Sequence, residues 1–302
     1  MAHVTRMGLI TILTVLGIFA VIYGWRLHRS SELANASVPA EYFPARANAT
    51  VVILGDSTAV GAGSQPRFSV AGRIANAFEG IEVSNLAVAG ANAGDIARQL
   101  LSMQRAKADI ILIQVGGNDV MSFETPQSFG DSLKEAVVAA RARAQTVILM
   151  PPGNLGGAPF FGPPISWYFS MRARQFNFIA RSTAQAYGAV FVGLFHEESE
   201  DPFAEAPELF YAADGLHPSE QGYAVLFGEL MRQARLAWLV GQPERERFSD
   251  TIPATVDSYS RSRPRPMKGR WALVQSGFVS QAAALRPSQR ISSAARRRAD
   301  AP

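Results

Sequence analysis

The chain has 302 residues, 48% of them hydrophobic, enough to bury the core of one large domain with attached segments. It contains no cysteine, which excludes disulfides, thiolate metal sites and a cysteine nucleophile. The net charge of +4 is uneven, because residues 241–302 hold twelve Lys or Arg against five Asp or Glu and the remainder carries −3. A mildly acidic core lacks the basic stripe that nucleic-acid binding requires, so we expect no nucleic-acid partner.

Residues 7–25 contain no charged side chain. The run is about long enough to cross a bilayer as a helix, and Trp25 and Arg26 end it as at a membrane interface. We therefore predict a transmembrane anchor over residues 7–25. The competing interpretation is a cleaved signal peptide, but the nearest small-residue cleavage site, at residues 34–36, lies well beyond the apolar run.

The flanks of this segment are basic on both sides, with Arg6 before it and Arg26 and Arg29 after it. The positive-inside rule therefore leaves the topology open. We expect a domain on the periplasmic or extracytoplasmic side, since a chain without thiols suits an oxidising compartment. Residues 26–48, with several Ser, Asn and Pro, are expected to form a linker between anchor and domain.

Residues 49–240 alternate short β-branched runs with stretches of helical spacing. Near-continuous apolar runs are typical of parallel strands covered on both faces, so the pattern predicts an α/β domain with an open parallel sheet between helices. The basic tail, residues 241–302, is rich in Arg, Ser and Pro and is expected to be disordered. The expected strands are Thr50–Leu54, Ile81–Val88, Asp109–Val115, Thr146–Met150 and Ala189–Leu194, and the expected helices are Phe129–Ala144, Met171–Ala186 and Ser219–Val240.

Three polar groups are expected at the carboxyl ends of these strands, where open α/β sheets bind ligands. Ser57 directly follows the first strand, as part of Gly55-Asp56-Ser57. Gly90 follows the second strand and can offer a backbone N–H, and Asn118 follows the third and can offer a side-chain N–H. With the Ser57 amide they would form an oxyanion hole, in which one donor typically contributes roughly a hundredfold in rate.

Asp214 and His217 stand three residues apart, just before the last predicted helix. A serine nucleophile needs a base within hydrogen-bond reach, and the base needs a group that fixes its tautomer. We therefore predict Ser57 as nucleophile, His217 as base and Asp214 as its orienting carboxylate. No further His or Cys stands at metal-ligand spacing beside them, so we expect neither a metal nor any other cofactor.

These four segments in this order resemble the SGNH hydrolase family, the GDSL-type esterases and lipases. The resemblance covers roughly residues 50–238 and lies in the Gly55-Asp56-Ser57 block, Asn85 with Gly90, the Gly116-Gly117-Asn118-Asp119 block and Asp214-x-x-His217. It implies a three-layer α/β/α sandwich similar to flavodoxin and the same roles for Ser57, Gly90, Asn118, Asp214 and His217.

An aromatic and glycine-proline loop over residues 156–169 follows the fourth predicted strand, and Phe161 and Trp167 within it are candidates for a substrate pocket. Packing against the rim of the sheet is the alternative. The predicted activity is cleavage of an acyl ester, as by a carboxylesterase, a lysophospholipase or a glycan O-deacetylase, with a lipid or an acylated glycan as substrate. Two alternatives stay open: an O-acyltransferase that uses the same residues, and a catalytically silent binding module at the membrane.

Overall fold

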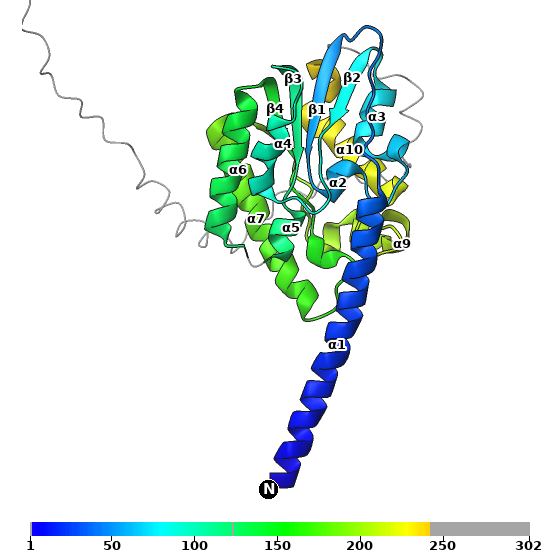
Figure 1. The fold of residues 1–302 in the computed structure, drawn as a ribbon, viewed down its shortest axis with the longest axis vertical. Helices are drawn as coiled ribbons and strands as arrows, with labels where there is room; N and C mark the ends of the chain where they lie inside the picture. The colour runs from blue at the N-terminus through cyan, green and yellow to red at the C-terminus, as the bar shows by residue number, and fades with distance from the viewer. Residues whose placement is uncertain (1, 123, 242–302) are drawn as a thin grey trace, which may run out of the picture. The chain divides into compact units, whose positions relative to one another are not determined.

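The computed structural model describes residues 2–122 and 124–241. The predicted tail, residues 241–302, lies outside the described residues apart from Gly241. Ahead of the domain the chain forms one helix, α1 (Ala2–Ala36), whose last turns lie against the domain while its amino-terminal part projects from it (Figure 1).

The domain is built on a five-stranded sheet whose strands all run parallel. Each strand is a short, mostly apolar run, as strands buried on both faces are. All five lie where the sequence predicts them, with ends that differ by a few residues. In spatial order they are β2 (Ile81–Asn85), β1 (Ala49–Gly55), β3 (Ala108–Gln114), β4 (Ala144–Leu149) and β5 (Val190–Phe191).

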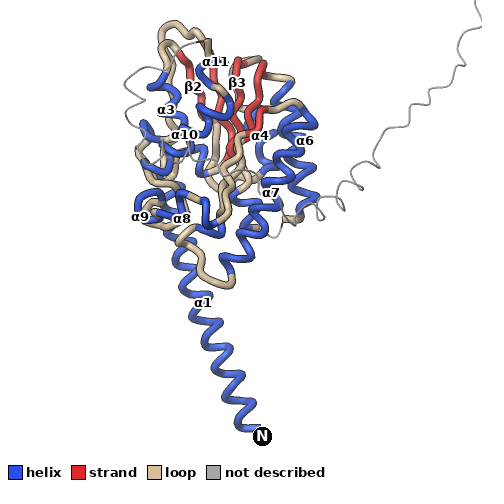
Figure 2. Tube along the Cα trace, turned by 180° about the vertical axis from the view of Figure 1, so that it is seen from behind, coloured by secondary structure: helices blue, strands red, loops and turns tan. Residues whose placement is uncertain are grey.

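Helices cover both faces of the sheet, giving three layers, α/β/α (Figure 2). Alternate residues of β1 enter different cores: Val51 and Ile53 pack in one, and Val52 and Leu54 in the other. The α/β sandwich with a parallel sheet is therefore confirmed. The first face carries α3 (Val70–Ala77), α10 (Glu220–Ala234) and α11 (Leu236–Leu239), and the second carries α4 (Ile96–Leu101), α6 (Pro126–Arg141) and α7 (Ile165–Tyr187).

The ends of the helices follow from local capping. Ser219 caps α10 by accepting a hydrogen bond from the Gly222 amide at 3.1 Å, as expected. The predicted last helix is interrupted, however, because Arg235 adopts a left-handed backbone with φ of 54° and separates α10 from α11. Short helical turns complete the domain: α2 (Ser57–Val60), α5 (Gly117–Met121), α8 (Pro202–Glu205) and α9 (Pro207–Phe210).

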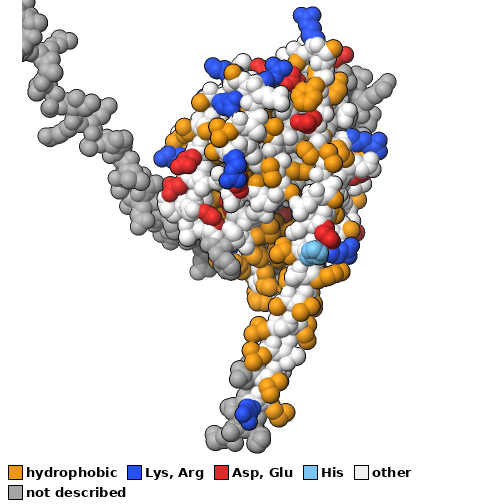
Figure 3. All heavy atoms as spheres, in the orientation of Figure 1, with side chains coloured by type: hydrophobic (Ala, Val, Ile, Leu, Met, Phe, Trp, Pro, Cys, Tyr) orange, Lys and Arg blue, Asp and Glu red, His pale blue; other side chains and the backbone are white. Residues whose placement is uncertain are grey.

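The predicted anchor, residues 7–25, lies inside α1. Exposed apolar side chains line the projecting part of this helix (Figure 3), among them Ile10, Leu13 and Leu16. Across residues 2–122 and 124–241, nevertheless, no helix has both the length and the apolar character needed to cross a membrane. The transmembrane anchor is not confirmed and stays a prediction.

The expected linker, residues 26–48, is different in the structure. It continues α1 without interruption as far as Ala36, and Tyr42 then pairs with Val83 of β2 through two backbone hydrogen bonds of 2.9 and 2.8 Å. Ser and Asn have modest helix propensity, which made the segment resemble a linker, but packing of one helix face against the domain overrides propensity.

The sheet order also determines where the loops that follow β1 and β3 separate. After β1 the chain crosses to β2 on one side, and it then returns to place β3 on the other side of β1. The loops that follow β1 and β3 therefore diverge at a topological switch point, where open α/β sheets hold their ligands. Ser57 follows β1, and Asn118 follows β3.

Candidate active site

Ser57, His217 and Asp214 form a continuous hydrogen-bonded chain. His217 Nε2 lies 2.8 Å from Ser57 Oγ, and His217 Nδ1 lies 2.6 Å from Asp214 Oδ2. An ionised carboxylate only accepts hydrogen bonds, so Nδ1 carries the hydrogen and Nε2 is left to accept from the Ser57 hydroxyl. The structure thus brings the three predicted side chains together, and their catalytic roles stay predictions.

The end of β1 positions Ser57. Gly55 holds a backbone φ of +149°, and a Cβ on it would lie 1.9 Å from the Gln114 carbonyl oxygen of β3, so only glycine fits. Asp56 then caps α2 by accepting a hydrogen bond from the Thr58 amide at 2.9 Å. The strand thus turns sharply into α2, with Ser57 as its first residue.

A tight turn positions the other two residues. Gly215 has φ of +70°, and the Asp214 Oδ1 atom accepts the amides of Leu216 and His217, each at 3.1 Å. The His217 side chain is buried, with 7% of the residue exposed. The backbone amides of its own turn therefore hold the Asp214 carboxylate through Oδ1, while Oδ2 contacts the imidazole.

The environment of Asp214 favours its ionised form. Burial would raise its pKa, but the hydrogen bond and charge of His217, together with further donors from Leu216 and Ser30, lower the pKa to about 2. Asp214 is therefore an anion throughout the neutral range, as a carboxylate that orients an imidazole must be.

The two predicted oxyanion donors outside α2, Gly90 and Asn118, lie on neighbouring loops. Asn118 Nδ2 donates to the Ala91 carbonyl at 2.8 Å, which ties the end of β3 to the loop that contains Gly90. Gly90 is exposed, has φ of +82°, and faces open space on the side where a Cβ would stand. The second N–H of the Asn118 amide and the Gly90 amide have no acceptor among the described residues.

Two acidic residues flank the site without joining it. Asp56 is 4% exposed, and burial raises its pKa despite the hydrogen bonds from Thr58 and Gly117. Burial likewise raises the pKa of Asp119 to about 6, against the effect of the Ala93 amide, which donates to it at 3.1 Å. Both carboxylates hold loops of the site in place.

The aromatic loop contains both pocket candidates, and the structure places them differently. Phe161 is half-buried and packs against Phe160 and Phe169, with ring centroids 4.9 and 4.6 Å away. Trp167 is 67% exposed, on the first turn of α7. The part of both side chains in a substrate pocket stays a prediction.

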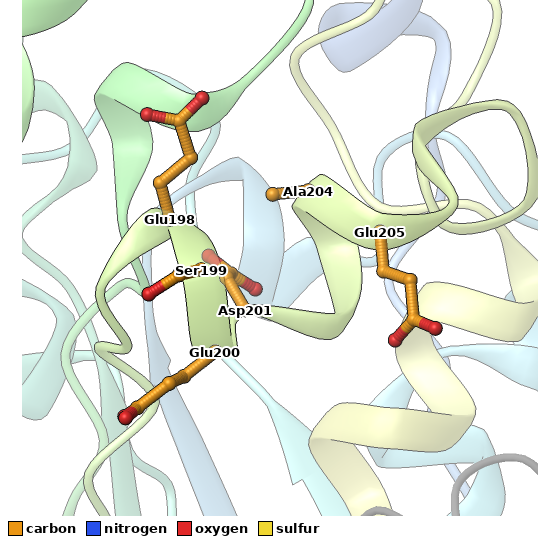
Figure 4. Close-up of a pocket in the computed structure, with 6 residues that line it drawn as sticks. All are labelled: Glu198, Ser199, Glu200, Asp201, Ala204 and Glu205. Carbon is orange, nitrogen blue, oxygen red and sulfur yellow. The ribbon is translucent and has the colours of Figure 1, made fainter.

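A hollow lies around the short helix α8. It encloses about 360 Å³, and Figure 4 shows carboxylates around it. None of Ser57, His217 or Asp214 lines it. The residues that line the hollow are Glu198, Ser199, Glu200, Asp201, Ala204 and Glu205. Among the described residues no group of three or more His, Cys, Asp or Glu is arranged to hold a metal ion.

Sequence reasoning missed one contact at the site. The Ser30 hydroxyl, from α1, lies 2.8 Å from Asp214 Oδ2 and 3.4 Å from His217 Nδ1. No signal in the sequence marks this contact, because it depends on how α1 packs against a turn that is 184 positions away.

Comparison with known protein families identifies the family of this chain. Residues 53–225, more than half of the chain, match the GDSL-like Lipase/Acylhydrolase family. The chain belongs to this family. The GDSL-like match covers every block that the sequence analysis singled out from β1 to the Asp214-x-x-His217 turn.

Two GDSL-like relatives illustrate the match. A GDSL-like esterase of Mycobacterium tuberculosis is 27% identical over 183 residues, which are 58% of this chain and 58% of that protein. The crystal structure of an extracellular lipase from Streptomyces rimosus is 19% identical, with a TM-score of 0.52, over 61% of this chain and 99% of the lipase. The second likeness shows the shared fold.

Within this GDSL-like domain, Asn85 of the second family block is a structural residue. It is buried, its Nδ2 donates to the Ala59 carbonyl at 2.9 Å, and its Oδ1 accepts the Ala87 amide at 3.2 Å. Asn85 thereby links the end of β2 to α2, the turn that carries Ser57.

Proposed function

We propose that this protein hydrolyses carboxylic esters through an acyl-enzyme on Ser57. The observation that carries the proposal is the 2.8 Å contact between Ser57 Oγ and His217 Nε2 in a chain that ends on the Asp214 carboxylate. A serine hydroxyl becomes a competent nucleophile when a base of this kind takes its proton during attack.

The proposed reaction has two halves. Ser57 Oγ attacks the ester carbonyl as His217 Nε2 takes the hydroxyl proton, and the imidazolium then gives that proton to the leaving alcohol. In the second half His217 takes a proton from water, the hydroxide attacks the acyl carbon, and the acid leaves as Ser57 Oγ regains its proton. Asp214 keeps its charge throughout and stabilises the imidazolium.

The proposed oxyanion hole consists of the Ser57 and Gly90 backbone amides and the Asn118 side-chain amide. Support comes from the fixed position of Asn118 beside the Gly90 loop and from the free N–H groups on both. Each donor would contribute about a hundredfold or more to the rate of acyl transfer.

The test is active-site labelling beside turnover. Wild-type protein, Ser57→Ala and a control, Ser64→Ala, would be treated with a fluorophosphonate probe and assayed with short-chain and long-chain chromogenic esters. Loss of labelling and turnover in Ser57→Ala alone is the expected result. A folded wild type that neither labels nor turns over would contradict the proposal and favour the binding module.

The acceptor distinguishes hydrolysis from acyl transfer, since both use one acyl-enzyme. Adding glycerol or a sugar to the assay would reveal the difference in the products. We expect the free acid to dominate, whereas transfer that outpaces hydrolysis would identify an O-acyltransferase.

We propose a lipid ester as the substrate. The support is the set of exposed apolar side chains where the aromatic loop enters α7, namely Trp167, Tyr168 and Met171. Exposed apolar groups clustered beside a site mark surfaces that meet apolar ligands. Phe161→Ala and Trp167→Ala should shift the preference between short and long acyl chains, and an unchanged chain-length profile would remove both residues from the pocket.

We further propose that residues 7–25 anchor the protein in a membrane with the domain on the extracytoplasmic side. The support is the absence of charge from this segment. Because the chain has no cysteine, a single Gln104→Cys variant reports on one place only. Labelling of intact cells by a membrane-impermeant maleimide would support the proposed side, and recovery of the protein in the soluble fraction would contradict the anchor.

A further inference from the structure

We propose that Ser30, on helix α1, is a positioning residue for the Asp214–His217 pair. The inference rests on the function proposed above, because it assigns Ser30 to the same site. In this arrangement the segment ahead of the domain supplies part of the apparatus that orients the base.

The contact is short and shielded from solvent. Ser30 Oγ lies 2.8 Å from Asp214 Oδ2, across 184 positions of the sequence, and Ser30 is 2% exposed. Hydrogen bonds to a charged group in a water-excluded site are stronger than ordinary ones. Burial raises the pKa of Asp214, and the interactions with His217, Leu216 and Ser30 lower it. Among these three the contribution of the Ser30 hydrogen bond is the smallest.

Ser30 completes the coordination of the carboxylate. Asp214 Oδ1 accepts two donors, the amides of Leu216 and His217, and Oδ2 accepts two more, His217 Nδ1 and the Ser30 hydroxyl. Three of these four donors come from the same short turn as Asp214 itself. Ser30 is the one that comes from elsewhere, and with it each carboxylate oxygen has two donors, which restrains rotation of the carboxylate.

The orientation of the Ser30 hydroxyl is unusual for a helix. Serine and threonine inside helices commonly donate to the carbonyl four residues earlier. Thr11 and Thr14 in α1 do this at 3.0 and 2.9 Å, and Ser37, directly after the helix, does so at 2.8 Å. Ser30 instead has its recorded contacts with Asp214 and His217. Its hydroxyl is therefore committed to the site rather than to its own helix.

Two neighbours on the same face hold α1 against the site. The Arg26 guanidinium donates to the Pro159 carbonyl at 2.9 Å and lies 5.1 Å from the centre of the Phe160 ring. The Tyr23 hydroxyl accepts the Gly162 amide at 3.0 Å. Residues three and four apart share a helix face, so Tyr23, Arg26 and Ser30 form one docking stripe.

The aromatic loop connects this stripe to the catalytic turn. The Phe160 amide donates to the Gly215 carbonyl at 2.9 Å, one residue after Asp214. Arg26 therefore fixes a loop that contacts the Asp214 turn, while Ser30 contacts Asp214 directly. The two contacts reach the same turn by separate routes.

The experiment compares Ser30→Ala with Ser31→Ala in the full chain. Ser31 is the adjacent helical serine and is exposed, so it is a matched control for helix propensity and for the loss of a hydroxyl. Ser30→Ala should lower kcat by roughly tenfold or more and leave KM within about twofold, since the lost bond orients the base and does not touch substrate. A kcat within about twofold of that of Ser31→Ala would overturn the proposal.

A second measurement does not require turnover. In a Ser57→Ala background, proton NMR would follow the low-field resonance of the His217 Nδ1 hydrogen that bonds Asp214. Adding Ser30→Ala should shift or broaden this resonance, and adding Ser31→Ala should not. An unchanged resonance would overturn the role of Ser30, whereas absent esterase activity in every variant would count against the proposed function alone.

Discussion

Gln99 holds Gly55 by both of its backbone groups. The Gly55 amide donates to Gln99 Oε1 and Gln99 Nε2 donates to the Gly55 carbonyl, each at 2.8 Å. Gly55 is the last residue of β1, two positions before Ser57. A side chain of α4 thus forms hydrogen bonds with the backbone of the last residue of β1, just before the chain enters the candidate site.

Replacing Gln99 by Ala should therefore destabilise the domain and disturb Ser57 together. The substitution leaves the buried Gly55 N–H without a partner and removes one of the two donors to the Gly55 carbonyl, which keeps the Val88 amide at 3.1 Å, so we expect a loss of about 2 kcal/mol in the free energy of unfolding. Denaturant titration would measure it. Gln104→Ala, at an exposed position, should change stability by less than about 0.5 kcal/mol, and equal losses in the two variants would contradict the stabilising role of the Gln99–Gly55 hydrogen bonds.

Gly55→Ala should be the most damaging single substitution in the strand. The added Cβ would meet the Gln114 carbonyl oxygen at 1.9 Å, and backbone atoms of a central strand cannot move aside cheaply. We expect a cost above about 4 kcal/mol, seen as insoluble protein or a sharply lowered Tm. Gly157→Ala is a suitable control because its Cβ would meet nothing closer than 3.8 Å, and a Gly55→Ala protein as stable as this control would contradict the expectation.

Asp201→Asn should stabilise the protein at neutral pH. Burial raises the pKa of Asp201 from 3.8 to about 6, so the folded state binds its proton more tightly than the unfolded chain. A raised carboxyl pKa means that this group costs stability as pH rises from about 4 to 6, and that the cost is complete above 6. Asn retains the cap that Asp201 gives to the Phe203 amide at 3.0 Å.

Thermal unfolding at pH 7 and pH 4 would check this prediction. We expect Asp201→Asn to gain about 2 kcal/mol at pH 7 and little at pH 4. Glu205→Gln removes an exposed carboxylate from the same hollow and should gain little at either pH. A gain that is the same at both pH values would show that charge is not the cause.

Shortening α1 should separate its two parts. Deleting residues 2–16 keeps the docking stripe of Tyr23, Arg26 and Ser30, and we expect near wild-type labelling by a fluorophosphonate. Deleting residues 2–37 removes the stripe and should lower the labelling rate by at least about tenfold, because the Ser30 bond and the Arg26 contact are both lost. Equal labelling rates in the two deletions would show that α1 contributes nothing to the site.

The sequence alone predicted the sheet well, for a physical reason. Strands buried on both faces must be continuously apolar, so Thr50–Leu54 was recognised within one residue of β1 at each end. The two edge strands were the exceptions: β2 ends at Asn85 although the prediction ran to Val88, and in β5 only Val190–Phe191 pairs although residues 189–194 share the pattern. An edge strand has one neighbour, and its paired length depends on that neighbour rather than on its own composition.

The candidate site divides in the same way. Asp214 and His217 were found because one turn holds both, and Ser57 because a strand end delivers it, and both relationships are local. Ser30 could not be found in this way, since its contact depends on how a whole helix packs against a distant turn. Ser30 and Ser31 are adjacent and identical in type, and they differ only in that Ser30 lies on the buried face of α1 and Ser31 on the exposed face.

The unbroken course of α1 has a mechanical consequence. The run of residues 7–25 and the Ser30 hydroxyl belong to one rod, and Ser30 stands roughly 7.5 Å beyond the end of that run at a rise of about 1.5 Å per residue. If residues 7–25 lie in a bilayer, as proposed, α1 would hold the candidate site at the level of the lipid headgroups. The enzyme would then search for substrate in two dimensions, sweeping the membrane surface instead of the solution above it.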